Sequence, residues 1–302
     1  MSLNLLILGS GSALPTLNSN QTAQVLETES EVYLIDCGEA TQIELRRHKV
    51  RVQRLNHIFI SHLHGDHFFG LVGLLSTMHL LGRQKTVHIH GPQGLEEIVR
   101  IQFRNAGSHL SYEMKFHTIT KGDELIHEDK YVKVTSLELN HRIQTFGFLF
   151  EEQPKPRKLI PEALAKYKIP NYARKSITQG EDYVDPDGKT VKNALLSTDP
   201  EPSRRYAYCS DTAFYEPLIQ RIENVDLLYH ESTFLDADIE RAKATYHSTA
   251  KDAARVANLA GVGKLLLGHF SNRYKNREGF LQEARPIFLE SHIAEEGERY
   301  SF

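Results

Sequence analysis

Three histidines and one aspartate lie within a six-residue stretch of this 302-residue chain. The stretch follows the apolar run at residues 57–60, which predicts that it begins where a buried strand ends. Imidazole nitrogens and carboxylate oxygens suit zinc, and ligands from both sides of one turn can serve two neighbouring ions. A histidine-rich surface loop is the alternative, but the density of ligand types favours a dinuclear metal site. The four residues are His62, His64, Asp66 and His67.

Three more metal-type side chains each stand just past another strand-like run. His141 comes after residues 132–139, Asp211 after residues 205–210, and His269 after residues 264–268. Open α/β sheets build their sites at such strand ends. Taken alone, each residue is as likely to have a capping or hydrogen-bonding role as to bind a metal. Their joint recurrence favours a shared metal site.

The elements that must position these residues alternate between strands and helices. Most predicted strands are apolar runs bounded by Gly, Asp or Asn, which is typical of sheets covered on both faces. We therefore expect an α/β fold with two sheets packed face to face and helices outside. The expected strands lie near 3–8, 22–27, 31–36, 57–61, 86–90, 131–139, 145–151, 205–210, 226–230 and 264–268. The expected helices lie near 67–81, 93–105, 214–222, 249–259 and 278–290.

The bulk composition, with 40% hydrophobic and 25% charged residues, is that of a soluble globular protein. The longest apolar stretches are shorter than a membrane span, and the N-terminus is expected to be a first strand without a leader. Cys37 and Cys209 form no CxxC pair, which favours reduced thiols in the cytoplasm. The net charge of −3 gives no general signal for nucleic acid.

One segment, residues 155–175, departs from that charge balance. It holds seven basic residues and a single acid, Glu162, and so carries a net charge of +6. Tyrosines lie among the cations, and four prolines in and beside the segment interrupt any long helix. A cationic, aromatic-bearing segment can bind a phosphate backbone, whereas the plain alternative is a solvated surface loop.

The order of these motifs resembles the metallo-β-lactamase superfamily: HxHxDH, then a single His, an Asp after a strand and a Gly-His after a strand. Within it, Tyr-His-Glu-Ser-Thr-Phe at 229–234 and His-Ser-Thr at 247–249 resemble the HEAT-type and HST motifs of the ribonuclease Z family. Residues 268–274 resemble its last ligand motif, so the resemblance covers nearly the whole chain. It implies one domain over residues 1–302 with the four-layer αβ/βα sandwich of that superfamily, and a homodimer.

The resemblance also implies two zinc ions per subunit and a set of ligands. His62, His64 and His141 would hold one ion, Asp66, His67 and His269 the other, and Asp211 would bridge them. Water between two cations loses a proton near neutral pH.

The catalytic roles are carried over from the same resemblance. Asp66 is assigned as general base as well as ligand. His247, held by Glu231, is assigned as proton donor to the leaving 3′-oxygen. Without the family motif, His247 would instead be an N-cap or surface histidine.

The basic segment falls where ribonuclease Z enzymes carry an arm that grips tRNA away from the cleavage site. We therefore expect an inserted substrate-binding arm at residues 153–190. Arg273 could contact the scissile phosphate or form a structural salt bridge. The expected arm contacts are Lys155, Arg157, Lys158, Arg174 and Lys175.

Two departures from the family pattern concern the RNA and leave the metal chemistry untouched. Residues 15–20 lack the two cations of the Pro-x-Lys-x-Arg-Asn loop, and the Gly-Pro motif of the arm is absent.

Asp36 either orients a ligand histidine or caps the next helix. The remaining histidines are expected to be ordinary core or surface residues: His79, His88, His109, His117 and His127.

The leading hypothesis is a zinc-dependent endoribonuclease that removes the 3′ trailer from precursor tRNA, leaving a 3′-hydroxyl on the tRNA and a 5′-phosphate on the trailer. The second is a phosphodiesterase or other hydrolase of the same fold acting on a small molecule, such as a cyclic nucleotide, thioester or lactone. The third, a non-catalytic RNA-binding protein with structural zinc, is disfavoured because structural zinc sites are closed and usually cysteine-rich.

Overall fold

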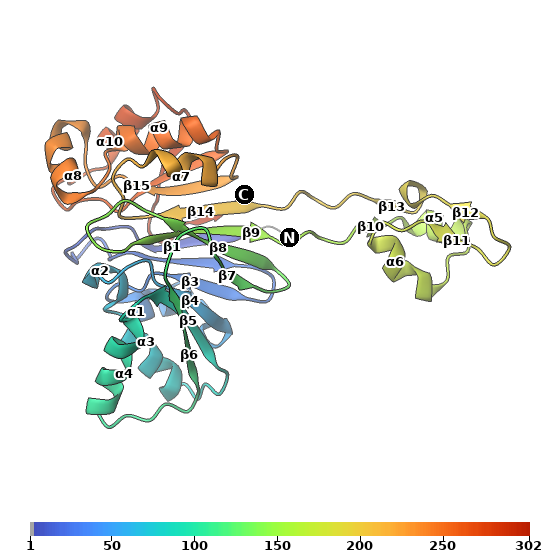
Figure 1. Cartoon of the computed structure of the whole chain (residues 1–302), viewed down its shortest axis with the longest axis horizontal. Helices are drawn as coiled ribbons and strands as arrows, with labels where there is room; N and C mark the ends of the chain where they lie inside the picture. Colours follow the sequence, from blue (N-terminus) through green and yellow to red (C-terminus); the bar gives the residue numbers. More distant parts are fainter. Residues whose placement is uncertain (1–2) are drawn as a thin grey trace. The chain divides into compact units, whose positions relative to one another are not determined.

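The computed structural model describes residues 3–302 and divides the chain into two compact units (Figure 1). The first unit runs to Glu151 and resumes at Arg204, and the second comprises Glu152–Ser203. No helix in residues 3–302 is long and apolar enough to cross a membrane.

The first unit contains two seven-stranded sheets, and the N-terminal sheet has the order β18-β1-β2-β3-β4-β5-β6. Strands β3 to β6 run parallel, so their carboxyl ends meet at one edge of the sheet. Its strands are β1 (Asn4–Gly9), β2 (Ala23–Glu27), β3 (Val32–Ile35), β4 (Leu55–Phe59), β5 (Val87–Pro92), β6 (Met114–Ile119) and β18 (Arg299–Ser301). The helices in this part are α1 (Thr41–Arg47), α2 (Gly65–Phe68), α3 (Leu71–Leu80), α4 (Leu95–Asn105) and the 3-10 turn η1 (Val52–Arg54).

The second sheet has the order β17-β16-β15-β14-β9-β8-β7, and β14 to β17 run parallel. Its strands are β7 (Leu125–Glu128), β8 (Val132–Glu138), β9 (Phe146–Glu152), β14 (Arg205–Cys209), β15 (Leu227–Glu231), β16 (Lys264–Gly268) and β17 (Ser291–Ile293). Its helices are α7 (Glu216–Arg221), η4 (Asp236–Asp238), α8 (Ile239–Thr245), α9 (Ala250–Ala260) and α10 (Glu278–Ala284). Helix α9 starts with a capping box between Thr249 and Asp252, so the His-Ser-Thr motif at 247–249 ends at the N-cap of this helix.

Three apolar cores hold these layers together. One packs helices α3 and α4 on the first sheet, and another packs α7, α9 and α10 on the second. The third lies between the sheets and combines residues of both, such as Phe59 of β4 with Phe148 of β9. Because each sheet is covered on both faces, central strands such as β3 and β15 are buried along their whole length. This helix–sheet–sheet–helix arrangement confirms the expected α/β sandwich.

The ten strands and five helices expected from the sequence are present, with bounds shifted by a few residues. Two helices differ from expectation. The helix expected at 67–81 is split into α2 and α3 at Gly70, where a side chain would meet the carbonyl of Gly38 at 2.0 Å. The helix expected at 278–290 ends at Ala284.

The second unit, Glu152–Ser203, has a small core of its own. Its apolar residues include Leu164, Ile177, Tyr183 and Leu196. The basic segment is therefore folded rather than a plain solvated loop, and Pro161 opens a short helix instead of breaking one. Its elements are β10 (Lys158–Leu159), α5 (Pro161–Lys166), η2 (Asn171–Ala173), α6 (Arg174–Thr178), β11 (Tyr183–Val184), β12 (Thr190–Val191), η3 (Asn193–Leu195) and β13 (Ser197–Thr198).

Candidate metal centre

The seven residues expected to bind metal come together where strands of both sheets end. His62 and His64 follow β4, and Asp66 and His67 lie in the short helix α2. The other three follow strands of the second sheet: His141 follows β8, Asp211 follows β14 and His269 follows β16.

The backbone turns sharply at these strand ends. Asp211 and His269 adopt left-handed backbone angles, with φ of 59° and 57°, as does Asp36 after β3, with φ of 55°. Such strained conformations are uncommon for residues other than glycine, and they cluster at functional sites. The strand ends thus aim their side chains at one point at some cost in backbone energy.

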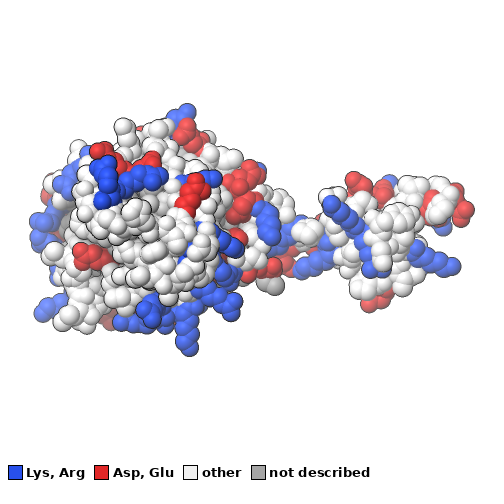
Figure 2. All heavy atoms as spheres, turned by 90° about the horizontal axis from the view of Figure 1, so that it is seen from below, with Lys and Arg blue, Asp and Glu red and all other residues white. Residues whose placement is uncertain are grey.

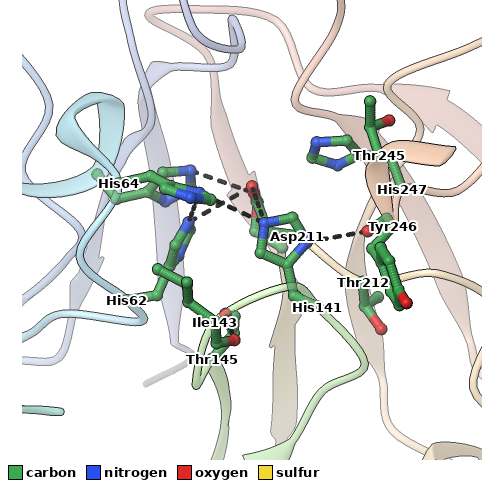
Figure 3. A network of polar contacts seen from close by, with 12 residues as sticks. His62, His64, His141, Ile143, Thr145, Asp211, Thr212, Thr245, Tyr246 and His247 are labelled. Atoms are coloured by element: carbon green, nitrogen blue, oxygen red, sulfur yellow. Dashed lines mark hydrogen bonds and ion pairs between the residues drawn. The ribbon is translucent and has the colours of Figure 1, made fainter. Parts of the chain in front are cut away.

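The first group of ligand atoms comes from His62, His64, His141 and Asp211 (Figure 3). The Nδ1 of His64 lies 3.0 Å from the Nε2 of His62 and 3.3 Å from the Nε2 of His141. Asp211 Oδ2 lies 3.5 Å from His62 Nε2. Ligand atoms around a tetrahedral zinc ion are separated by about 3.3 Å, so these residues fit one ion.

The second group comes from Asp66, His67 and His269. The Nε2 atoms of the two histidines are 3.3 Å apart, and Asp66 Oδ2 lies 3.5 Å from that of His269. Asp211 Oδ1 is 3.1 Å from both Nε2 atoms, while its Oδ2 faces the first group. Asp211 is 2% exposed and stands between the two groups with one oxygen toward each.

The far nitrogens of the ligand histidines also have partners. Nδ1 of His67 lies 2.7 Å from Asp36 Oδ2, Nδ1 of His141 lies 3.0 Å from the Tyr246 carbonyl, and Nδ1 of His269 lies 2.9 Å from Thr233 Oγ1. Metal-binding histidines characteristically have such second partners, which fix the ring orientation.

Asp36 therefore orients a ligand histidine, which decides between its two expected roles. It also accepts hydrogen bonds from the Ser61 backbone N–H and the Tyr208 hydroxyl, at 2.7 and 2.5 Å. The helix that follows, α1, has Ala40 at its N-cap.

The electrostatics match a cation site. Burial lowers the pKa of His62 and His141, and lowers that of His64 to about 4, so these rings are neutral at pH 7. Burial alone would raise the pKa of Asp211, but the histidines around it hold that pKa well below its usual value.

The second group behaves differently because carboxylates surround its central ring. Burial opposes protonation of His67, yet Asp211, Asp36 and Asp66 raise its pKa well above the usual value. The protein thus favours positive charge at the point where a metal would lie, and metal binding would release that proton.

The two residues assigned to proton transfer form a close pair. His247 Nδ1 lies 2.7 Å from Oε1 of the fully buried Glu231. Glu231 also accepts hydrogen bonds from the backbone N–H groups of Thr212 and Ser248, which fixes the carboxylate. Although burial lowers the pKa of His247, Glu231 raises it to about 9.

A cavity of about 460 Å³ opens onto both groups. Of the residues expected from the sequence, His64, Asp66, Asp211, His247 and His269 line it. The wall also contains residues that the sequence did not single out, notably Arg142, Glu39 and Phe69. Nothing in the residue type marks Arg142; its position next to His141 was the one available signal.

Arg273 lies elsewhere. Its side chain is exposed and does not line this cavity. It forms no ion pair with any residue in the described part of the chain. The salt bridge is thus not formed within residues 3–302, and contact of Arg273 with the scissile phosphate stays a prediction.

The five basic residues expected to contact substrate fall into two classes within the second unit. Lys155, Arg157 and Lys158 pair with Glu152, Asp199 and Glu201. Arg174 and Lys175 of α6 are exposed and have no ion-pair partner among residues 3–302. The unit as a whole has nine basic and eight acidic residues, and Figure 2 shows both kinds on its surface.

Comparison with known proteins gives relatives for the whole chain and for its first half. Residues 3–153 match the family model described as Anti-Pycsar protein Apyc1. Ribonuclease Z of Porphyromonas gingivalis is 48% identical over 291 residues, which is 96% of each chain. Ribonuclease Z of Bacteroides fragilis is 45% identical over the same share of both chains.

Among solved structures, the short form of human tRNase Z (ELAC1) superposes with a TM-score of 0.71. The two sequences are 26% identical, and the match covers 99% of this chain and 98% of the other. The full-length relatives include the inserted unit Glu152–Ser203, whereas the family model ends at its start.

Proposed function

Because the chain belongs to the ribonuclease Z family, we propose that it is an endoribonuclease that removes the 3′ trailer from precursor tRNA. Cleavage would leave a 3′-hydroxyl on the tRNA and a 5′-phosphate on the trailer. The observation that carries this proposal is the convergence of two ligand groups, shared through Asp211, with the His247–Glu231 pair on one cavity. We also propose a cytoplasmic homodimer, on the family resemblance alone.

We propose that two zinc ions per subunit occupy the two ligand groups. His62, His64 and His141 would hold one ion, and Asp66, His67 and His269 the other, with Asp211 contacting both. When bound, such a pair of dications makes hydroxide available near neutral pH and offsets negative charge at the reacting phosphate.

Asp66 would orient the attacking water and remove its proton. Its Oδ2 faces His269 and accepts a hydrogen bond from the Ala13 backbone N–H at 2.7 Å. Its Oδ1 has no hydrogen-bond partner among residues 3–302, so this oxygen is available to the water.

His247 would protonate the leaving 3′-oxygen as the bond from phosphorus to that oxygen breaks. Its raised pKa keeps the ring protonated at neutral pH, and Glu231 holds Nδ1. The other nitrogen, Nε2, is then the proton donor. A donor positioned in this way contributes about 10²- to 10⁴-fold to the rate.

We propose that the second unit binds the tRNA backbone through Arg174 and Lys175, which form no ion pair with a carboxylate in the described residues. Tyr172, 80% exposed, lies just before them and offers a stacking surface. Lys155, Arg157 and Lys158 already hold acidic partners, so they contribute less to phosphate binding.

The direct test incubates the purified chain with a 3′-extended precursor tRNA and maps the ends produced, with and without chelator. We expect one cut that leaves a 3′-hydroxyl on the tRNA, and loss of that cut when the metal is removed. An intact precursor after reconstitution with zinc would overturn the proposal.

A second candidate is a hydrolase that acts on small phosphodiesters. It is favoured by the family match over residues 3–153, which contains five of the seven candidate ligands but ends where the arm begins. A parallel assay with bis(p-nitrophenyl) phosphate distinguishes the two candidates. Turnover of this small substrate, while the precursor tRNA stays intact, would support the second candidate. RNA binding without either activity would support a non-catalytic role.

A further inference from the structure

A second group of histidines lies apart from the candidate metal centre. His57 is in β4, His88 and His90 in β5, His117 in β6 and His127 in β7. The ring centroids of His57 and His127 are 3.9 Å apart, and those of His90 and His117 are 4.5 Å apart. The structure thus brings His88, His117 and His127, which were expected to be ordinary residues, into one cluster that spans both sheets.

Three of these rings direct ligand atoms at a common point. His57, His90 and His127 each offer a nitrogen, and these nitrogens lie within 4.8 Å of one another. His57 Nδ1 is 3.4 Å from His90 Nε2. That separation is close to the spacing of about 3.3 Å between ligand atoms of a tetrahedral zinc ion. It also resembles the 3.3 Å between His64 Nδ1 and His141 Nε2 at the candidate metal centre.

His90 also has an unsatisfied nitrogen in the protein interior. The residue is 1% exposed, and its Nδ1 has no hydrogen-bond partner in the described residues. Its other ring nitrogen, Nε2, faces His57 and is the candidate ligand atom. Burial lowers the pKa of His57 to about 3 and that of His90 to about 2, so both rings are neutral, as metal ligands must be.

A carboxylate adjoins one of the three rings. Asp129 Oδ2 lies 3.1 Å from His127 Nε2 and accepts a hydrogen bond from the Tyr33 hydroxyl at 2.5 Å. A carboxylate beside a histidine fixes the ring and partly offsets the charge of a bound dication.

The strand that carries His127, β7, has an irregular pairing next to this residue. The register of β7 with β8 shifts between Leu125 and His127. Such bulges re-aim side chains at the edges of sheets. A cleft of about 410 Å³ beside this strand is lined by His117 of β6 and by Ile126, the neighbour of His127.

We propose that His57, His90 and His127 form a third metal site, for a borderline divalent transition metal such as Zn²⁺. The ion would fasten β7, an edge strand of the second sheet, to β4 and β5 of the first. Stacking alone would explain the ring contacts but not the three nitrogens that lie within 4.8 Å of one another. None of the three residues lines the cavity at the candidate metal centre, so this site is separate from it.

The test compares zinc content in three otherwise identical proteins: the wild type, His127→Gln and a control, His109→Gln, which removes an exposed histidine outside the cluster. Each is stripped of metal, reconstituted with excess zinc and passed through a desalting column before elemental analysis. We expect the wild type and the control to retain one more zinc ion per chain than His127→Gln. Equal zinc content in all three proteins would overturn the proposal.

A second variant covers the outcome in which His127→Gln does not fold. His57→Phe keeps an aromatic ring for stacking but removes the ligand nitrogen, so it too should lose one zinc ion. Zinc should raise the melting temperature of the wild type more than that of either cluster variant, and equal increases would count against the site. Because both readouts are independent of RNA cleavage, failure here is distinct from failure of the proposed function.

Discussion

His247 is the residue on which the proposed proton transfer depends. It lines the cavity with His64, Asp66 and His269, and its ring centroid is 5.4 Å from that of His269. Replacing His247 by Ala should slow RNA cleavage by about 10²- to 10⁴-fold, because the leaving oxygen loses its donor. Metal content should remain at the wild-type level, since seven other side chains form the two ligand groups. Loss of zinc in this variant would instead make His247 a ligand or a support for one.

Glu231 controls the protonation of His247, and this dependence can be measured directly. In the metal-free protein, Glu231 raises the pKa of His247 to about 9 against the opposing effect of burial. The interaction therefore stabilises the fold below the unfolded-state pKa of about 6.5, and this stability is lost as the pH rises through about 9. Glu231→Gln should move the His247 pKa below 9, as followed by NMR titration of the chelated protein. An unchanged pKa would show that another group holds the proton.

The candidate site could be predicted residue by residue only where the residue type is rare and its position is distinctive. The seven candidate ligands are histidines and aspartates at strand ends, and the structure brings them together. Arg142 gave no such signal, because an arginine after a strand is usually a surface residue. The cluster around His90 was also missed, because β4, β5 and β7 are brought together by tertiary packing rather than by sequence spacing.

At the scale of elements, the buried parallel strands could be predicted because they are continuous apolar runs. In the first unit, the missed strands and α-helices are short or partly exposed: β6, β7, β17, β18, α1 and α8. Strand β7 shows the reason, since none of its four residues is buried and it lies at an edge of the sheet. Its pairing and position come from the neighbouring strand and the facing sheet, which no local pattern records.

The inserted unit, Glu152–Ser203, can be removed without breaking the pairing of strands β9 and β14. Glu151 of β9 pairs with Arg205 of β14 in antiparallel register, so the chain leaves and re-enters the body on neighbouring strands. Replacing residues 153–203 by Asn-Gly should close these strands with a tight hairpin. We expect loss of precursor tRNA cleavage and retention of bis(p-nitrophenyl) phosphate turnover. Cleavage of tRNA at the full rate after this replacement would exclude the unit from substrate binding.

The two classes of cation within that unit lead to a sharper prediction. Arg174 and Lys175 have no acidic partner within residues 3–302, whereas Lys192 pairs with Asp182 at 2.8 Å. The double variant Arg174→Ala, Lys175→Ala should weaken tRNA binding and reduce the slope of log K against log salt by about two. Lys192→Ala, the control, should have little effect on either quantity. Filter binding over a range of salt concentrations measures both, and equal effects from the two variants would contradict the assignment.

At the scale of the whole molecule, the metal centre joins the two sheets, because its ligands follow strands of both. Without cations, the carboxylates of Asp36, Asp66 and Asp211 remain close together around His67, whose pKa they raise. Chelation should therefore lower the melting temperature. Ligand linkage gives about 2.7 kcal/mol per site when free zinc is 100-fold above its dissociation constant.

Calorimetry of the wild type and Asp211→Asn, each with zinc and with chelator, measures this coupling. Zinc should raise the melting temperature of the variant less than that of the wild type, because the residue shared by the two ligand groups has lost its charge. Magnesium should not replace zinc, since imidazole-rich sites favour borderline transition metals. If chelation left the wild-type melting temperature unchanged, the two groups would not act as a metal-dependent link between the sheets.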